Sequence, residues 1–192
     1  MTTTSTVPRN QAHWLKQYYF VRTGVSLLWI AAAFTVGQHS EPAATTLLVS
    51  YPAWDALANY LDASRSGGLA QNRTQLINVI VSVLATLAVA FTIQISMNWV
   101  IGVFGAWAIL AGLLQLATAA RRWKTYGAQW AMILSGGQSA LVGAILIVQA
   151  RMPVPPSILN IAGYASGGAF YFLVSAVWLV VSELRQRASA AS

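Results

Sequence analysis

Long apolar stretches recur along the chain, and short polar segments separate them. A helix needs roughly 20 mostly apolar residues to cross the hydrocarbon core of a bilayer. Six stretches reach or approach this length: about Tyr18–Val36, Ala44–Asp62, Leu76–Ile95, Trp99–Ala119, Ala128–Val148 and Ile158–Val181. The pattern therefore predicts an all-α, polytopic membrane bundle of six transmembrane helices.

The second stretch is the most polar of the six, because it contains Pro52, Asp55 and Asn59. Its composition fits either a surface helix or a membrane crossing. Charge favours a crossing: with six crossings, all but one of the 11 Lys and Arg residues lie on one side of the membrane, and only Arg151 lies on the other. Cytoplasmic loops carry such an excess of basic residues. We therefore expect the second stretch to cross and both termini to be cytoplasmic.

Composition agrees with a membrane location, since 57% of the residues are hydrophobic and only 8% are charged. The net charge of +7 then follows from topology and from contact with anionic lipid. It does not indicate a nucleic-acid-binding surface, because no soluble basic domain is predicted. The expected partner is the lipid bilayer, with no nucleic acid. The chain has no cysteine, which excludes disulfides and cysteine metal ligands.

The predicted organisation is a single six-helix membrane domain over residues 18–185. A disordered Thr- and Ser-rich tail and an interfacial anchor occupy residues 1–17, and a cytoplasmic tail occupies residues 186–192.

The even-numbered stretches share a short motif, which consists of Ala, an aromatic residue and then Leu three positions later. It occurs in Pro52–Asn59, Gly105–Gly112 and Gly168–Ser175. Apolar helices built from few residue types can resemble each other by chance. Alternatively, three helical hairpins, at about 18–62, 76–119 and 128–181, repeat around a pseudo-threefold axis. The motif favours the repeat, because its three copies agree in position and order.

Glycines provide candidate packing positions on two of the stretches. Gly105 and Gly112 lie on the fourth stretch, and Gly163 and Gly167 form a G-x-x-x-G pair on the sixth. Small residues let helix backbones approach closely inside lipid. These positions serve either packing within the bundle or dimerisation, and we expect packing within the bundle.

Arg22 and Asp55 are charged residues inside predicted crossings. Counting from the helix ends at 1.5 Å per residue puts both roughly 6–10 Å below the same membrane interface. Because an isolated buried charge is costly, we expect a buried ion pair between them. Two alternatives are that Arg22 extends to the lipid headgroups, or that Asp55 titrates as part of a proton- or solute-responsive site.

Several uncharged polar residues also fall within the crossings. Asn59 lies one turn from Asp55, and the others of interest are Asn78, Gln138, Tyr164 and Tyr171. Such groups either form hydrogen bonds between helices or line a polar cavity.

The sequence offers little for catalysis. The two histidines, His13 and His39, fall near opposite membrane faces, so neither can serve a serine within the bilayer. An aspartyl dyad needs two buried acids, and only Asp55 qualifies. No zinc-protease motif, phosphate-binding loop or metal-ligand cluster occurs. We therefore expect no enzyme activity, no catalytic residue, no metal and no cofactor.

The segments Tyr51–Asn59, Gly105–Gly112 and Gly168–Leu173 resemble those of the HdeD family of acid-resistance membrane proteins, and the likeness extends from about Tyr18 to Arg185. The resemblance implies a bacterial inner-membrane protein with six helices in three hairpins, and a link to acid stress for some members. It implies no particular reaction, substrate or functional residue.

Two functions remain open. One is a non-enzymatic inner-membrane protein that supports envelope or acid-stress tolerance. The other is a small transporter or channel subunit that moves protons or a small solute and uses Asp55. A transporter should contain a polar cavity that reaches the middle of the membrane, whereas a structural protein should have these polar groups hydrogen-bonded and dry. A homo-oligomer fits both, because one small bundle leaves little room for a wide pore.

Overall fold

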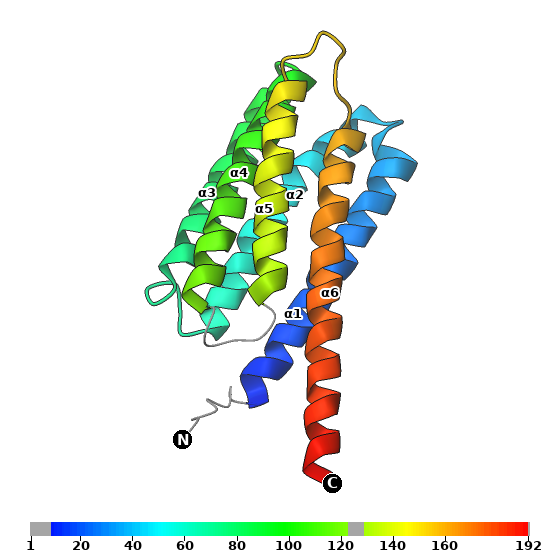
Figure 1. The fold of residues 1–192 in the computed structure, drawn as a ribbon. Coiled ribbons are helices and arrows are strands. Elements are labelled where there is room, and N and C mark those ends of the chain that lie inside the picture. The colour runs from blue at the N-terminus through cyan, green and yellow to red at the C-terminus, as the bar shows by residue number, and fades with distance from the viewer. Residues whose placement is uncertain (1–8, 123–128, 192) are drawn as a thin grey trace.

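The computed structural model describes residues 9–122 and 129–191, and in these ranges the chain is almost entirely helical (Figure 1). Six long helices follow one another: α1 (Arg9–Ala32), α2 (Glu41–Arg65), α3 (Arg73–Thr92), α4 (Met97–Arg122), α5 (Gln129–Gln149) and α6 (Ile158–Ala191). A short π-helical segment, η1 (Ala33–Gly37), extends α1. The predicted all-helical class and the six helices are confirmed.

The helix ends differ from the predicted ones at both termini. Helix α1 begins at Arg9, so residues 9–17, which include the expected interfacial anchor, continue the first helix. Helix α6 continues to Ala191, well beyond the predicted end of the last crossing. Residues 1–8, which were expected to be disordered, lie outside the described residues.

Local sequence explains where α2 begins and ends. Ser40 caps its N-terminus, because the Ser40 side chain accepts a hydrogen bond from the Ala43 backbone N–H. After Arg65 the chain turns through Gly67 and Gly68, whose φ angles of 97° and 88° suit glycine. The Asn72 side chain then donates to the Ser66 and Gly68 carbonyls at 2.8 and 2.9 Å, which fixes the turn before α3.

The helices form a closed ring in which each contacts its sequence neighbours and α6 returns to pack along α1 (Figure 1). The closest pairs are α4 with α5, α2 with α3, and α1 with α6, while α1 and α2 touch only a little. The bundle therefore consists of a pair, α1 and α6, set against a group of four, α2 to α5. The segment η1 joins these two parts at one end, because it contacts both α2 and α6.

Glycines set the close approach of α4 and α5. Gly105 faces Gly143 and Gly112 faces Gly136, so both contacts repeat after seven residues. A Cβ atom added to Gly112 would lie 2.5 Å from the Gly136 carbonyl oxygen, and one added to Gly143 would lie 2.6 Å from that of Gly105. The two backbones thus touch along two helical turns, where dispersion contacts replace the missing hydrophobic effect in lipid.

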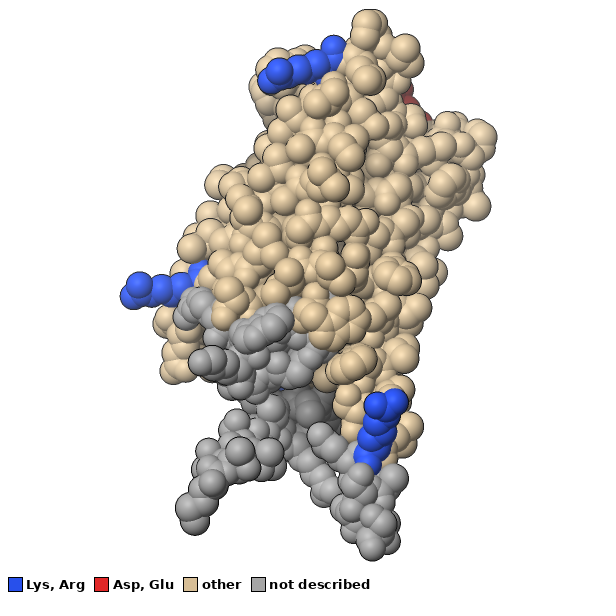
Figure 2. All heavy atoms as spheres, viewed as in Figure 1, with Lys and Arg blue, Asp and Glu red and all other residues tan. Residues whose placement is uncertain are grey.

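Five of the six helices are long and apolar enough to span a membrane, and α2 is the exception. Large apolar side chains such as Leu28, Leu87 and Phe91 are more than half exposed. On the face shown in Figure 2, the middle of the described surface carries no Lys, Arg, Asp or Glu. These features describe a multi-pass membrane protein, because lipid is the solvent that suits such a surface.

The two ends of the bundle differ in charge. One end holds the beginning of α1, the end of α6 and the α2–α3 turn, and we call it the basic end because it carries Lys16, Arg65, Arg73 and Arg185. The opposite end carries the α5–α6 connection with Arg151.

The interior also changes between the ends. In the half away from the basic end, an apolar core includes Trp29, Leu48, Ile101, Phe104 and Ile161. The half towards the basic end contains most of the buried polar side chains, such as Asp62 and Gln75.

Candidate functional site

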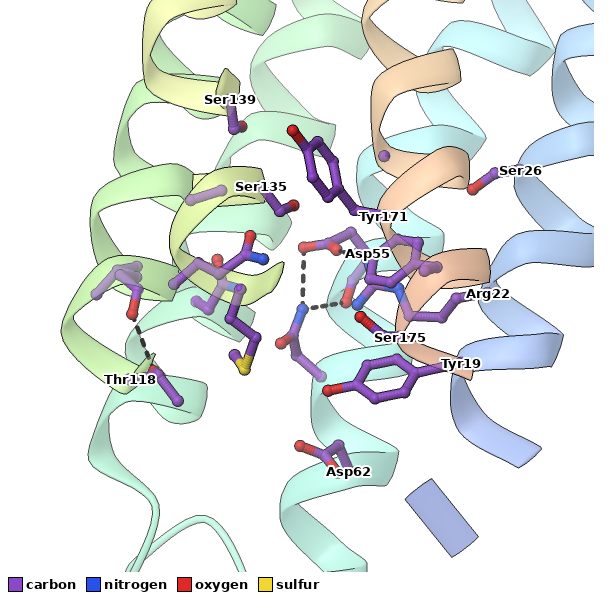
Figure 3. Close-up of a pocket in the computed structure, with 18 of the residues that line it drawn as sticks. Tyr19, Arg22, Ser26, Asp55, Asp62, Thr118, Ser135, Ser139, Tyr171 and Ser175 are labelled. Carbon is purple, nitrogen blue, oxygen red and sulfur yellow. Dashed lines mark hydrogen bonds and ion pairs between the residues drawn. The ribbon is translucent and has the colours of Figure 1, made fainter. Parts of the chain in front are cut away.

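A polar cavity of about 140 Å³ lies inside the half of the bundle that faces the basic end (Figure 3). All six helices line it. It extends from Tyr164 and Trp107, near the middle of the bundle, to Asp62, Thr74 and Thr118, near the helix ends. One water molecule needs roughly 10–15 Å³ of such volume, so the cavity accommodates a hydrated or solute-sized guest.

Helix α2 supplies the acidic wall of the cavity. Asp55, Asn59 and Asp62 follow each other at spacings of four and three residues, which places them on one helix face. That face points inward, and each of the three residues is only 8% exposed. The composition that makes α2 too polar for lipid is therefore buried in the protein interior.

Arg22 and Asp55 meet at the middle of the cavity wall. The Arg22 Nη2 donates to Asp55 Oδ1, and Nη1 donates to the Tyr18 hydroxyl at 2.9 Å. The guanidinium lies over the Phe172 ring, 4.3 Å from its centre. The side chains of Arg22 and Asp55 are only 12% and 11% exposed, so each charge depends on the other for compensation.

The second carboxylate oxygen of Asp55 accepts two hydrogen bonds. Asp55 Oδ2 accepts from Asn59 Nδ2 at 3.0 Å and from Ser82 Oγ at 2.9 Å. Ser82 Oγ in turn accepts from Trp107 Nε1 at 3.0 Å. This network connects α1, α2, α3 and α4 through one carboxylate, which gives Asp55 a role in holding the helices together.

Aromatic side chains close the cavity towards the apolar core. The Tyr51 ring contacts Trp29, Phe104, Trp107 and Tyr164, with centroid separations of 4.8–6.5 Å. Tyr164 is also held by a hydrogen bond, because its hydroxyl lies 3.0 Å from the Ser139 hydroxyl. We call these five aromatic residues the aromatic roof, because nothing beyond them towards Arg151 lines the cavity.

Some polar side chains in the rest of the cavity wall have fewer hydrogen-bond partners than Asp55 has. Asp62 has one hydrogen-bond contact, from Gln75 Nε2 at 3.5 Å. No ion pair to Asp62 is found among the described side chains. Ser135 and Ser175, which are 9% and 5% exposed, form no side-chain hydrogen bond within the described part of the chain, and both point into the cavity (Figure 3).

Three buried polar atoms in the cavity wall have no hydrogen-bond partner in the described residues: Arg22 Nε, Trp54 Nε1 and Asn78 Oδ1. An unpaired buried polar group costs about 1–3 kcal/mol. These three atoms can therefore form hydrogen bonds to a guest or to ordered water in the cavity.

The structure brings together every polar residue that the sequence analysis selected. Arg22 contacts Asp55, and the cavity is lined by the remaining five: Asn59, Asn78, Gln138, Tyr164 and Tyr171. Asp62, Gln75, Ser82 and Trp107 were missed. The signal for Asp62 was present, because the spacing from Asp55 to Asn59 continues to it along the same helix face.

The selected glycines have different environments. Gly105 and Gly112 lie in the α4–α5 contact, and Gly167 lies against the Gln138 side chain. Gly163 faces open space, because a Cβ atom there would have no neighbour within 4 Å. The prediction that Gly163 packs within the bundle is therefore wrong, because the face of α6 that carries Gly163 points outward.

No group of three His, Cys, Asp or Glu side chains is found in the described part of the chain. The two carboxylates of the cavity, Asp55 and Asp62, are two helical turns apart on α2, or roughly 10 Å. Chemically, the arrangement offers a neutralised ion pair, one further carboxylate and many hydroxyl and amide groups.

Comparison with known proteins gives one match. Residues 77–148, from the beginning of α3 to the end of α5, match the family described as "Short repeat of unknown function (DUF308)". The match covers less than half of the chain. No curated protein and no solved structure matches the chain.

Proposed function

We propose that this protein is a non-enzymatic, multi-pass protein of the bacterial inner membrane that binds a small polar solute in the cavity. In this proposal the solute enters the cavity from the cytoplasm, and the protein acts as a small transporter. The observation that carries the proposal is a buried polar cavity, lined by Asp55, Asn59 and Asn78, that reaches the middle of the bundle. Intramembrane ionisable residues typically mark solute pathways.

The orientation rests on charge. The cavity lies towards the basic end, and cytoplasmic loops are the ones enriched in Lys and Arg. In this orientation both termini are cytoplasmic and α2 crosses the membrane with the other five helices. Its 25 residues correspond to about 37 Å of helix, and its polar face is covered by protein rather than by lipid.

A threefold arrangement of helical hairpins belongs to the same proposal. Around the ring, close contacts (α2–α3, α4–α5 and α6–α1) alternate with looser ones (α1–α2, α3–α4 and α5–α6). Three similar hairpins around one axis would give this alternation. The looser contacts are then those within each hairpin, and the closer contacts are those between neighbouring hairpins. The match to a short-repeat family supports it further.

A second candidate function is support of acid-stress tolerance. It is favoured by the match over residues 77–148, because the HdeD acid-resistance protein belongs to this short-repeat family. The test is survival of a deletion strain at low pH. Restored survival with the wild-type gene would support the role, and survival unchanged by the deletion would exclude it.

Solute binding can be tested with a single cysteine, because the chain has none of its own. Ser175→Cys places a thiol in the cavity, and Ser64→Cys places one on the exposed end of α2 as a matched control. In inside-out membrane vesicles, alkylation rates are measured with an impermeant reagent and a panel of small cations, anions and neutral polyols.

The proposal predicts that at least one solute class slows alkylation of Ser175→Cys and leaves Ser64→Cys unaffected. If the cavity thiol reacts at the same rate with every class present, the protein does not bind a small solute there.

A further inference from the structure

We propose that the solute is a small organic monocation and that the carboxylate of Asp62 is its counter-charge. This inference rests on the proposed solute-binding function and specifies the chemical class of the solute. It depends on three features of the cavity: its charge balance, its free hydrogen-bond acceptors and its size.

Among the described residues, the charges of the cavity do not balance. The described lining contains one cationic side chain, Arg22, and two carboxylates, Asp55 and Asp62. Arg22 is committed to Asp55 by a direct ion pair. Asp62 lies about 10 Å further along α2 and is only 8% exposed, and no ionic partner for it is found among the described side chains.

No described neighbour can supply the missing positive charge. At the level of Asp62, the cavity is lined by Tyr18 from α1, Gln75 from α3 and Thr118 from α4, and none of these is basic. Arg65, one turn further along α2, instead lies over the Trp14 ring at 4.7 Å. A buried carboxylate without a partner is costly, and a bound cation would remove that cost.

The cavity also contains available hydrogen-bond acceptors. Ser135, at the level of Asp55, and Ser175 point their hydroxyl groups into the cavity, and neither forms a side-chain hydrogen bond among the described residues. A hydroxyl oxygen accepts as well as donates. Asn59 must present its NH₂ group to Asp55, because both atoms that it contacts there, the Asp55 backbone O and Oδ2, are acceptors. Its amide oxygen therefore remains available for the N–H groups of an ammonium ion.

Size and aromatic content favour an organic ion over a bare metal ion. A cavity of about 150 Å³ is known to hold benzene in another protein, so the volume of about 140 Å³ suits a guest of roughly six heavy atoms. The Tyr19 ring lines the same cavity as Asp62 and stacks on Phe172, with ring centres 6.2 Å apart (Figure 3). A cavity that is lined by both aromatic rings and a carboxylate is a favourable environment for an alkylammonium ion.

The experiment is calorimetric titration of the purified full-length protein in lipid nanodiscs at pH 7. Three organic ligands of similar size are compared: butylammonium, butanol and butyrate. Sodium chloride and potassium chloride are titrated separately, to test whether an inorganic cation binds. Butylammonium alone should bind. Asp62→Asn should weaken its binding at least about tenfold, because a buried charge loses its partner.

Two control variants separate the role of charge from that of structure. Asp62→Glu keeps the carboxylate and should bind butylammonium within a few-fold of wild type. Glu41→Gln removes an exposed carboxylate at the end of α2 away from the cavity and should bind as wild type does. The comparison among ligands uses the wild-type protein, so it holds even if Asp62→Asn does not fold.

Each other outcome overturns the inference in a recognisable way. Binding of butanol or butyrate in place of butylammonium would leave solute binding intact and exclude a cation. Binding of sodium or potassium alone would exclude an organic ion. Equal affinity of wild type and Asp62→Asn for butylammonium would remove Asp62 as the counter-charge. If no ligand binds and no solute slows alkylation of Ser175→Cys, both this inference and the proposed function are wrong.

Discussion

At the scale of single residues, Asp55 and Asp62 show how position on one helix face separates two roles. Asp55 receives hydrogen bonds from Arg22, Asn59 and Ser82, so its charge is fully compensated. Asp62, two turns away, has a single long contact among the described residues, with Gln75. Asp55 therefore suits a role in stability of the helix bundle, and Asp62 is the residue that we propose for solute binding.

Removing one member of the Arg22–Asp55 pair leaves the other charge buried. Arg22→Leu and Asp55→Leu should each destabilise the protein by about 3–5 kcal/mol. The double variant should be less destabilised than either single variant, because no unpaired charge remains. Thermal melting in detergent measures all three, and a double variant that melts lowest would refute this assignment.

Ser82 carries a prediction of its own. Ser82→Ala removes a donor to Asp55 and leaves Trp107 Nε1 without its acceptor, so it should destabilise the protein by about 1–3 kcal/mol. Ser166→Ala is the matched control, because Ser166 is exposed and bonds only to the Ala162 carbonyl of its own helix. Equal melting temperatures for the two variants would show that the network adds no stability.

The pair Arg22–Asp55 could be predicted from the sequence, because the depth of each residue follows from counting along its own helix. Ser82 and Trp107 could not be predicted in the same way. They lie on α3 and α4, and their contact with Asp55 depends on how these helices are rotated about their axes. That rotation is fixed by packing between helices, which the apolar pattern of the sequence does not specify.

At the scale of helices, α4 and α5 are the most closely packed pair, and glycine is the reason. The sequence indicates Gly105 and Gly112 as packing positions but does not identify their partners. Gly136 and Gly143 become their partners only through the antiparallel register, in which Gly105 meets Gly143 and Gly112 meets Gly136.

Adding one methyl group tests the α4–α5 contact. Gly112→Ala puts a Cβ atom 2.5 Å from the Gly136 carbonyl oxygen, so the helices must separate, at a cost of about 1–3 kcal/mol. In Gly137→Ala the new Cβ has no neighbour within 4 Å, and higher helix propensity should leave stability unchanged or raise it by up to about 1 kcal/mol. Detergent melting compares the two, and similar losses for both would argue against the close contact.

At the scale of the whole molecule, the protein is asymmetric along its long axis. An apolar core and the aromatic roof close one half, and a polar cavity occupies the other. The distribution of basic residues predicts which ends of the helices lie together. The cavity itself does not follow from any one stretch of sequence, because it forms where α1 and α6 face the group of four other helices and all six contribute to its wall.

The most direct test of this account asks from which side of the membrane water reaches the cavity. Ser175→Cys, Ser64→Cys at the basic end and Ser157→Cys in the α5–α6 connection are treated with an impermeant thiol reagent in inside-out and right-side-out vesicles. The account predicts that Ser175→Cys and Ser64→Cys react only in inside-out vesicles, and Ser157→Cys only in right-side-out vesicles. A Ser175→Cys variant that reacts from the periplasmic side, or from neither side, would contradict it.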